Sequence, residues 1–411
     1  MTAKTTCVVV GGGPAGMVFG LLLARAGVHV TVLEKHADFL RDFRGDTVHP
    51  TTLRLIEELG LWPRFAALPQ SQVRKVAFDR AAGHPVTVVS FEKLRQPHPY
   101  IAMVPQWDLL NLLAEAGEAE PTFTLRMSTE VTGLLQEGGR VAGVRYQGPD
   151  GPGELRADLT VGCDGRTSVV RQAAGLPVRE WPVSFDAWWF RLPQPDTEST
   201  FTLLPRLAAG KAMIVIPRTD YLQIALLIPK GSDARLRARG LEAFHAAVLD
   251  LFPEAGDKVE SVTSLDDVKH LDVRLNRLRR WHTDGLLCIG DAAHAMSPAG
   301  GVGINMAVQD GVAAARLLAE PLRHGTPTDR ELGAVRRRRL VPTAVTQAFQ
   351  RQFDKRFLGP ILRGGDTSGP PPALLRLFDL MPWLAVIPGH LVGVGVLPEH
   401  APAFARRTPA G

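Results

Sequence analysis

The chain has 411 residues, 45% hydrophobic and 22% charged, with a formal net charge of +5. This length allows roughly two to three domains, and the hydrophobic fraction is ample for a buried core, so we expect an ordinary globular protein. No apolar run approaches the roughly 20 residues that span a bilayer, because prolines and glycines interrupt the stretch from Met381 to Leu397, so we expect no integral membrane segment.

The basic character does not indicate nucleic-acid binding. Its densest run, residues 336–339, lies in a predicted helix without interleaved aromatic residues, and the remaining charge is dispersed. The first residues, MTAKTT, lack the features of a signal peptide, so we expect a cytoplasmic protein. Cys7, Cys163 and Cys288 are sparse and odd in number, which favours reduced core thiols, and no metal-binding spacing occurs.

The first motif lies at the N-terminus, where an apolar strand, residues 7–10, runs into a glycine-rich turn and then an apolar helix. Gly11, Gly13 and Gly16 match G-x-G-x-x-G, with Pro14 and Ala15 between them. The first glycine makes the tight turn, the second lets a pyrophosphate approach, and the third lets helix and strand pack closely.

A second strand, residues 28–33, ends in Glu34 and is followed by Lys35. Glu34 lies 34 − 13 = 21 residues after Gly13, which is the position of a ribose-binding acid. Strand, glycines, helix, strand and acid together predict an adenine dinucleotide site, and at this point NAD and FAD both remain open.

Two later stretches have a similar pattern of strand, aspartate and helix. In one, residues 159–171, a strand leads to Asp164-Gly165, and Arg171 lies in the helix that follows. In the other, residues 286–305, a strand leads to Gly290-Asp291, a glycine-rich turn, and a helix predicted from Ala307 onward. Taken alone, each aspartate also fits a helix N-cap.

Together, the three stretches resemble the fingerprints of the flavoprotein hydroxylases, the family of para-hydroxybenzoate hydroxylase, which are aromatic-ring monooxygenases with one FAD. The resemblance implies an α/β fold with an α+β insert. A Rossmann-like FAD-binding domain of the glutathione-reductase type would carry an inserted β-sheet substrate domain and C-terminal helices. We expect the FAD-binding domain at residues 1–72, 101–176 and 270–411, and the substrate domain at residues 73–100 and 177–269.

The same resemblance implies which residues hold the cofactor. Asp291 would bond the ribityl or pyrophosphate region, and the turn from Gly300 to Asn305 would lie beside the isoalloxazine ring. Val302 departs from the family, in which glutamine is frequent at this position. The expected FAD-binding residues are Gly11, Gly13, Pro14, Ala15, Gly16, Glu34, Lys35, Arg44, Gln106, Asp164, Gly165, Arg171, Gly290, Asp291, Pro298, Gly301, Gly303, Ile304 and Asn305.

The middle of the chain is rich in short strands. Residues 212–216 and 221–228 predict a hairpin, and in the aromatic run of residues 185–192 two adjacent tryptophans would face opposite sides of a strand. No catalytic group stands out, and His294 is expected to pack near the cofactor. The weak candidates, each of which also fits a structural or solvated position, are Trp188, Arg191, Tyr221 and His49.

The resemblance implies a single-component monooxygenase that takes a hydride from NADPH or NADH and hydroxylates an aromatic, polyketide or quinolone-like small molecule through a flavin C4a-hydroperoxide. An FAD-dependent reductase or an oxidative cyclase or epoxidase on the same fold is the alternative. An NAD dehydrogenase and a catalytically silent binding protein are further ones. The sequence leaves open the substrate, the position oxidised, the nicotinamide preference, Baeyer–Villiger-type oxidation, and whether the chain is a monomer or a homodimer.

Overall fold

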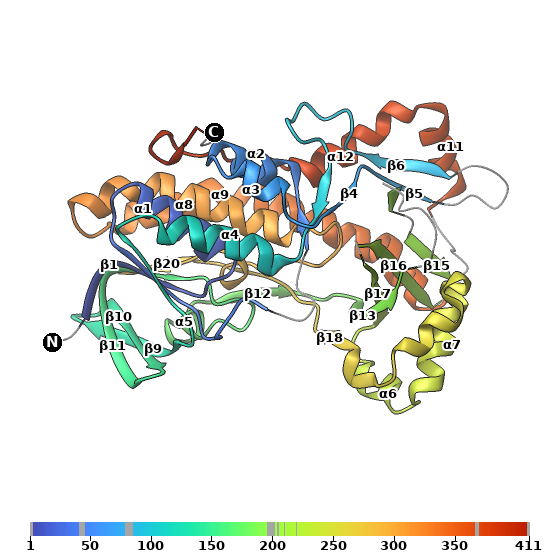
Figure 1. The fold of residues 1–411 in the computed structure, drawn as a ribbon, viewed down its shortest axis with the longest axis horizontal. Helices are drawn as coiled ribbons and strands as arrows, with labels where there is room; N and C mark the ends of the chain where they lie inside the picture. The colour runs from blue at the N-terminus through green and yellow to red at the C-terminus, as the bar shows by residue number, and fades with distance from the viewer. Residues whose placement is uncertain are drawn as a thin grey trace.

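The computed structural model describes residues 3–40, 46–78, 85–194, 202–203, 205–208, 210–218, 220–365 and 370–408. A large sheet with helices over it lies at one end of the molecule, and an antiparallel sheet lies at the other (Figure 1). This arrangement confirms the predicted α/β fold with a Rossmann-like domain.

The large sheet has the strand order β20-β21-β11-β1-β2-β8, and β10 and β9 extend from β11. The pairings β21-β11, β11-β1, β1-β2 and β2-β8 are parallel, so these strands present their carboxyl ends at one edge, where ligands of such sheets bind. The strands are β1 (Ala3–Val10), β2 (Val30–Leu33), β8 (Phe123–Arg126), β9 (Glu130–Glu137), β10 (Arg140–Gly148), β11 (Gly151–Gly162), β20 (His282–Thr283) and β21 (Leu286–Cys288).

Four helices lie together over this sheet (Figure 1): α1 (Pro14–Arg25), α4 (Gln106–Glu118), α8 (Gly303–His324) and α9 (Asp329–Phe353). Helix α1 starts with a proline, whose fixed φ suits the first turn, and its next ten residues are all buried. It crosses α8 so closely that a Cβ on Gly311 would lie 2.9 Å from the Ala15 carbonyl oxygen. Helix α8 begins at Gly303, four residues before the predicted start at Ala307, because the end of the glycine-rich stretch is already helical.

The antiparallel sheet has the order β15-β16-β17-β13-β18. Strands β16 and β17 form the predicted hairpin, and the adjacent tryptophans of β13 face opposite sides. Trp188 packs with Phe244 of α7 (Leu241–Leu251), whereas Trp189 packs on the other side with residues that include Ile216. The strands are β13 (Phe185–Pro193), β15 (Pro205–Ala208), β16 (Lys211–Pro217), β17 (Tyr221–Pro229) and β18 (Lys269–Leu271).

Three small sheets complete the fold. They are β14 (Thr202–Leu203), β5 (Lys75–Phe78) and β6 (Val86–Ser90); β3 (Thr47–Val48), β7 (Ile101–Met103) and β4 (Ser71–Val73); and the ribbon of β12 (Val178–Trp181) with β19 (Leu275–Leu278). The ribbon pairs a strand from the predicted substrate domain with one from the predicted FAD-binding domain. The domain boundaries therefore stay a prediction.

The remaining helices are short. They are α2 (Pro50–Glu58), α3 (Trp62–Ala66), α5 (Val169–Ala173), α6 (Asp233–Arg237), η1 (Pro253–Ser261), η2 (Leu265–Asp267), η3 (Gly290–Ala292), η4 (Asp354–Leu358), α10 (Gly359–Leu362), α11 (Pro372–Leu380), η5 (Pro382–Ala385), α12 (Val386–Gly393) and η6 (Ala403–Ala405). Within the described ranges, no single helix is long and apolar enough to cross a bilayer; one sharply bent pair, 372–380 with 382–393, passes by length and composition only.

A fully buried carboxylate, Asp310 of α8, joins three parts of the fold. Its Oδ1 accepts a hydrogen bond from Arg339 Nε of α9 at 2.9 Å, and its Oδ2 accepts one from Gly290 N at 3.1 Å and contacts His294 Nε2 at 2.5 Å. Burial by itself would raise the pKa of Asp310, but the charges and hydrogen bonds of His294 and Arg339 outweigh it and lower that pKa. Asp310 therefore holds α8, α9 and the turn after β21 together as a carboxylate.

Replacing Asp310 with alanine should lower the free energy of unfolding by roughly 3–5 kcal/mol, because the Arg339 guanidinium would stay buried without its carboxylate. The matched control is Asp329→Ala, which removes an exposed carboxylate from the start of α9 and should cost less than about 1 kcal/mol. Urea unfolding of both variants measures the difference. Equal losses would show that Asp310 contributes no more than a surface charge.

Candidate functional site

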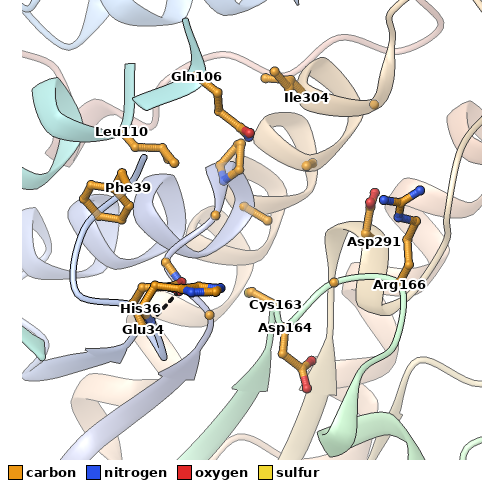
Figure 2. Close-up of a pocket in the computed structure, with 18 of the residues that line it drawn as sticks. Glu34, His36, Phe39, Gln106, Leu110, Cys163, Asp164, Arg166, Asp291 and Ile304 are labelled. Carbon is orange, nitrogen blue, oxygen red and sulfur yellow. Dashed lines mark hydrogen bonds and ion pairs between the residues drawn. The ribbon is translucent and has the colours of Figure 1, made fainter. Parts of the chain in front are cut away.

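One pocket lies between the carboxyl-end edge of the large sheet and the antiparallel sheet. The turns after β1, β2, β11 and β21 line one part of it, and residues from β13, β16 and β18 line another part. Figure 2 shows Glu34, Asp164 and Asp291 arranged around this pocket, each from the end of a different parallel strand. Residues far apart in the sequence thus meet because their strands end at the same edge.

The glycine-rich turn after β1 is open toward the pocket at one position and closed at the others. A Cβ on Gly11, whose φ is +104°, would lie 2.6 Å from the Cys163 carbonyl oxygen, and one on Gly16 would lie 2.1 Å from the Gly11 carbonyl oxygen. A Cβ added at Gly13 would meet no atom within 4 Å. Gly13 is also the N-cap residue of α1, and no side chain there accepts a hydrogen bond from the first helical amides. The amides of the first helical turn are thereby left for an anion such as a pyrophosphate.

Glu34 is held at the pocket wall by backbone amides. Its Oε2 accepts a hydrogen bond from Gly12 N at 2.9 Å, and its Oε1 accepts one from His36 N at 3.1 Å. A carboxylate oxygen can accept more than one hydrogen bond, so a carboxylate at this position suits the hydroxyls of a ribose.

The turn after β11 is organised by Asp164. Its carboxylate accepts hydrogen bonds from Ser168 Oγ at 2.5 Å and from Val170 N at 3.1 Å, so it caps helix α5 while lining the pocket. Burial raises the pKa of Asp164 despite these bonds. Arg171 does not line the pocket; its guanidinium donates to the carbonyls of Arg166 at 2.7 Å and Ala292 at 3.3 Å, which joins this turn to the turn after β21.

Asp291 follows β21 and lines the pocket, and its side chain lies beside that of Arg166 (Figure 2). The preceding residue, Gly290, has a φ of +60°, and its amide is held by Asp310. Helix α8 thus fixes the backbone on which Asp291 stands.

The turn before α8 is held by side chains from residues 47–52, at β3 and the start of α2. Thr47 Oγ1 donates to the Gly301 carbonyl at 2.6 Å, and the Thr51 and Thr52 hydroxyls each donate to Asn305 Oδ1 at 2.7 Å. Because two hydroxyls donate to the same amide oxygen, the Asn305 NH₂ group is the part left free to donate elsewhere.

His49 lies behind the same turn, fully buried. Its Nε2 is 3.0 Å from the Gly301 carbonyl oxygen, and its Nδ1 is 2.9 Å from the Val392 carbonyl oxygen of α12. Burial lowers the pKa of His49 to about 4, although both backbone contacts oppose that shift. A neutral imidazole has one N–H and can donate to only one of the two carbonyls.

The part of the pocket under the antiparallel sheet is largely apolar. Trp189, Ile216 and Leu271 come from the sheet, and Met103 and Met296 come from elsewhere in the chain. One ion pair interrupts this surface: Arg218 Nη2 contacts Asp46 Oδ2, and both side chains are mostly buried. Burial raises the pKa of Asp46, although Arg218 opposes the shift.

The structure brings most of the predicted cofactor residues into the pocket wall. Gly16, Gly290, Arg171 and Asn305 support it from behind, and Arg44 lies outside the described residues. The predicted residues that line the pocket are Gly11, Gly13, Pro14, Ala15, Glu34, Lys35, Gln106, Asp164, Gly165, Asp291, Pro298, Gly301, Gly303 and Ile304.

None of the four weak catalytic candidates lines this pocket. Trp188 faces away and donates from Nε1 to Asp233 Oδ1 at 2.7 Å. The Arg191 guanidinium lies 4.7 Å from the centre of the Tyr221 ring. His49 lies behind the Gly301 turn and contacts the Gly301 and Val392 carbonyls, so the geometry gives none of the four candidates direct access to a reacting atom.

Several lining residues were missed by the sequence analysis. Phe39 and Thr129 follow the ends of β2 and β8, and the order of strands in the sheet is what places them at the pocket. Asp46 and Arg218 lie outside the helices and strands, and Thr47 begins the short strand β3; none of the three belongs to a motif. The only available signal for Thr47 was its closeness in sequence to Arg44.

A family model described as an FAD binding domain matches residues 4–349 of the chain. The chain belongs to the class A FAD-dependent aromatic monooxygenase family. The 6-methylpretetramide 4-monooxygenase of Streptomyces rimosus is 36% identical over 341 residues, which are 82% of this chain and 80% of that protein. The 12-dehydrotetracycline 5-monooxygenase/anhydrotetracycline 6-monooxygenase of Streptomyces rimosus subsp. rimosus is 30% identical, over 74% of this chain and 60% of that protein.

Among solved structures, the p-nitrophenol 4-monooxygenase of Pseudomonas putida aligns with a TM-score of 0.74 and 21% identity, covering 94% of this chain and 96% of that one. This likeness concerns the fold. The family model and the 36% identical relative show that the protein is an FAD-dependent monooxygenase. The open glycine turn, the amide-held Glu34 and the sheet-edge aspartates fit FAD. Across the described ranges, no group of three or more His, Cys, Asp or Glu side chains could hold a metal ion.

Replacing Gly13 with alanine should raise the Kd for FAD at least tenfold while leaving the apoprotein as stable as the wild type, because the new methyl group meets only the space beside the first turn of α1. The control Gly133→Ala on β9 also adds a methyl group in open space, but outside the pocket, and should bind FAD normally. Fluorescence titration of the apoproteins with FAD measures both. Normal FAD affinity in Gly13→Ala would place the cofactor elsewhere.

The wild type should lose roughly 2–3 kcal/mol more stability than His49→Gln between pH 7.5 and 4.5. Folded His49, with its pKa lowered to about 4, stays neutral where an unfolded histidine of ordinary pKa 6.5 takes up a proton. Protons therefore favour the unfolded wild type as the pH falls through this window, and glutamine removes the effect. Urea unfolding of both proteins at both pH values measures this difference. An equal change in the free energy of unfolding for the wild type and His49→Gln would contradict the lowered pKa of folded His49.

Proposed function

We propose that this enzyme hydroxylates a polycyclic aromatic substrate of the polyketide type, with O₂ as oxidant and NADPH or NADH as the electron donor, as a single-component monooxygenase. The 36% identical relative, whose name specifies a 4-monooxygenase of 6-methylpretetramide, is the observation that carries the substrate class. A second, 30% identical relative is named for tetracycline-type compounds as well. In this proposal, residues 73–100 and 177–269 supply the substrate-binding part.

The shape and chemistry of the pocket support such a substrate. Trp189 and Ile216 of the antiparallel sheet line the same pocket as Gly301 and Gly303 of the turn before α8. A flat ring system bound between them would contact apolar side chains on one side and the cofactor on the other. The Asp46–Arg218 ion pair gives this part of the pocket a polar end that can orient oxygen substituents.

The chain's own residues hold the cofactor and exclude water. Bound FAD supplies the activation of O₂ and the transfer of an oxygen atom. Glu34 would accept hydrogen bonds from the ribose, and the first turn of α1 would bind the pyrophosphate. Backbone amides at the start of α8 would stabilise negative charge on the ring without introducing a charged side chain. Apolar walls keep water from the reacting atoms.

We further propose that the enzyme works in the cytoplasm as a monomer or a homodimer. The three cysteines are all free, and burial raises the pKa of each thiol, which suits structural residues in a reducing compartment. Gel filtration with light scattering distinguishes the two assembly states.

The decisive experiment supplies the purified FAD-loaded enzyme with 6-methylpretetramide, NADPH or NADH, and ¹⁸O₂. We expect one labelled oxygen atom in the product by mass spectrometry, and reduction of the flavin under anaerobic conditions that is faster with this compound than without it. A changed product without label would instead establish a reductase or an oxidative cyclase. Flavin reduction by neither nucleotide would contradict the single-component mechanism.

A further inference from the structure

A group of arginines surrounds Trp181 on the two-stranded ribbon, outside the pocket described above. In the antiparallel pairing of β12 with β19, Arg179 stands directly opposite Arg277, and Trp181 stands opposite Leu275. Two like charges directly opposite one another destabilise a pair of strands. The ribbon therefore carries a local electrostatic cost that its own pairing does not relieve.

Trp181 is 9% exposed, and three guanidinium groups approach its indole ring. The carbon centres of Arg179, Arg277 and Arg351 lie 5.0, 5.3 and 5.3 Å from its ring centroid. Each distance is within the range of a cation–π contact, so one aromatic ring brings three positive charges together. Arg351 lies near the end of α9, and its contact with Trp181 packs that end of the helix against the ribbon.

A fourth arginine, Arg336 of α9, adds to the positive charge at Arg277. Burial lowers the pKa of Arg277, and the charges of the neighbouring arginines lower it further, with no carboxylate acting in the opposite direction. The Trp181 arginine cluster, as we call these residues with the indole, comprises Arg179, Arg277, Arg336 and Arg351.

Over the described ranges, none of the four arginines is in a salt bridge, although neighbours in sequence are. Arg274 binds Asp272 at 2.7 Å, and Arg338 and Arg339 bind Glu399 and Asp310. The basic run of α9 is thus divided: its last two arginines are matched by acids, whereas Arg336 is not. This contrast separates the Trp181 arginine cluster from ordinary surface charge.

Two nitrogens within the cluster are buried and make no hydrogen bond. They are Nη1 of Arg277 and Nε of Arg336. Buried donors on a charged group are rare in native proteins and commonly mark the place of an ion or a water molecule. Arg179 and Arg351 are exposed, so an anion can reach the cluster from solvent.

The cluster lies close to the cofactor-binding segment. Strand β19 donates from Asn276 N to the Ala295 carbonyl at 3.2 Å and from Leu278 N to the Ala293 carbonyl at 2.8 Å. Arg277 stands between these two residues, on a strand bonded directly to the turn that follows Asp291.

We propose that the Trp181 arginine cluster binds a phosphate group. Guanidinium groups offer paired N–H donors that match phosphate oxygens, and the charge of a phosphate dianion offsets several arginines at once. The phosphate is that of the nicotinamide nucleotide or of a separate phosphate compound, and the first source rests on the proposed function above. Binding removes the repulsion between Arg179 and Arg277 and can satisfy the buried donors.

The test is calorimetric titration of the FAD-loaded protein with inorganic pyrophosphate, NADP⁺ and NAD⁺ at low ionic strength, which avoids turnover. We expect pyrophosphate to bind the wild type and its Kd to rise at least tenfold in Arg277→Gln. The exposed variants Arg179→Gln and Arg351→Gln should each weaken binding severalfold and are not expected to disturb folding. Arg239→Gln, which removes an exposed arginine outside the cluster, should bind as the wild type does.

The nucleotides identify the source of the phosphate. If the cluster variants bind NADP⁺ more weakly but NAD⁺ normally, the phosphate is the 2′-phosphate of NADP⁺. If they bind both nucleotides more weakly to the same extent, it is the pyrophosphate of the nucleotides. If they bind both normally but lose the inorganic pyrophosphate, it belongs to a separate phosphate compound. No binding of any probe, or Kd values unaffected by all three substitutions, would overturn the proposal. Pyrophosphate binding without hydroxylation would contradict only the proposed function.

Discussion

The buried carboxylate of Asp310 is the interaction on which the site most depends. It lies in α8, yet it bonds the amide of Gly290 at the end of a strand and the guanidinium of Arg339 in another helix. A charge can remain in such a place only when several donors surround it. The same donors therefore fix the distance between the strand that presents Asp291 and the helix whose first turn borders the pocket.

Close backbone approach is the second constraint. The turn after β1 packs against the turn after β11 so tightly that a side chain at Gly11 would overlap the Cys163 carbonyl. A Cβ at Gly13, two residues further on, would meet no atom within 4 Å. Gly11 lets the two turns pack closely, whereas Gly13 leaves room for a ligand.

The chain also supports its pocket from segments far away in sequence. Thr47, which lines the pocket, and His49, which lies behind its wall, both contact the Gly301 carbonyl, and His49 also contacts the Val392 carbonyl of α12. A glycine turn has few conformational restraints of its own. Its shape next to the cofactor thus depends on polar side chains that belong to no recognisable motif. Helix α12 contacts the turn both through the His49 imidazole and through Val392, which packs against Val302.

The sequence by itself determined the parallel sheet, the adenine dinucleotide turn and the acid at Glu34, because each depends on local spacing along the chain. It also placed the two tryptophans of β13 on opposite faces, since side chains alternate along a strand. Only the tertiary structure decided that Trp189 rather than Trp188 meets the pocket, and that His49 supports a turn some 250 residues away in sequence. It likewise showed which arginines of α9 have acidic partners and which gather around Trp181. Such pairings depend on how strands and helices pack, and no local pattern of residues records them.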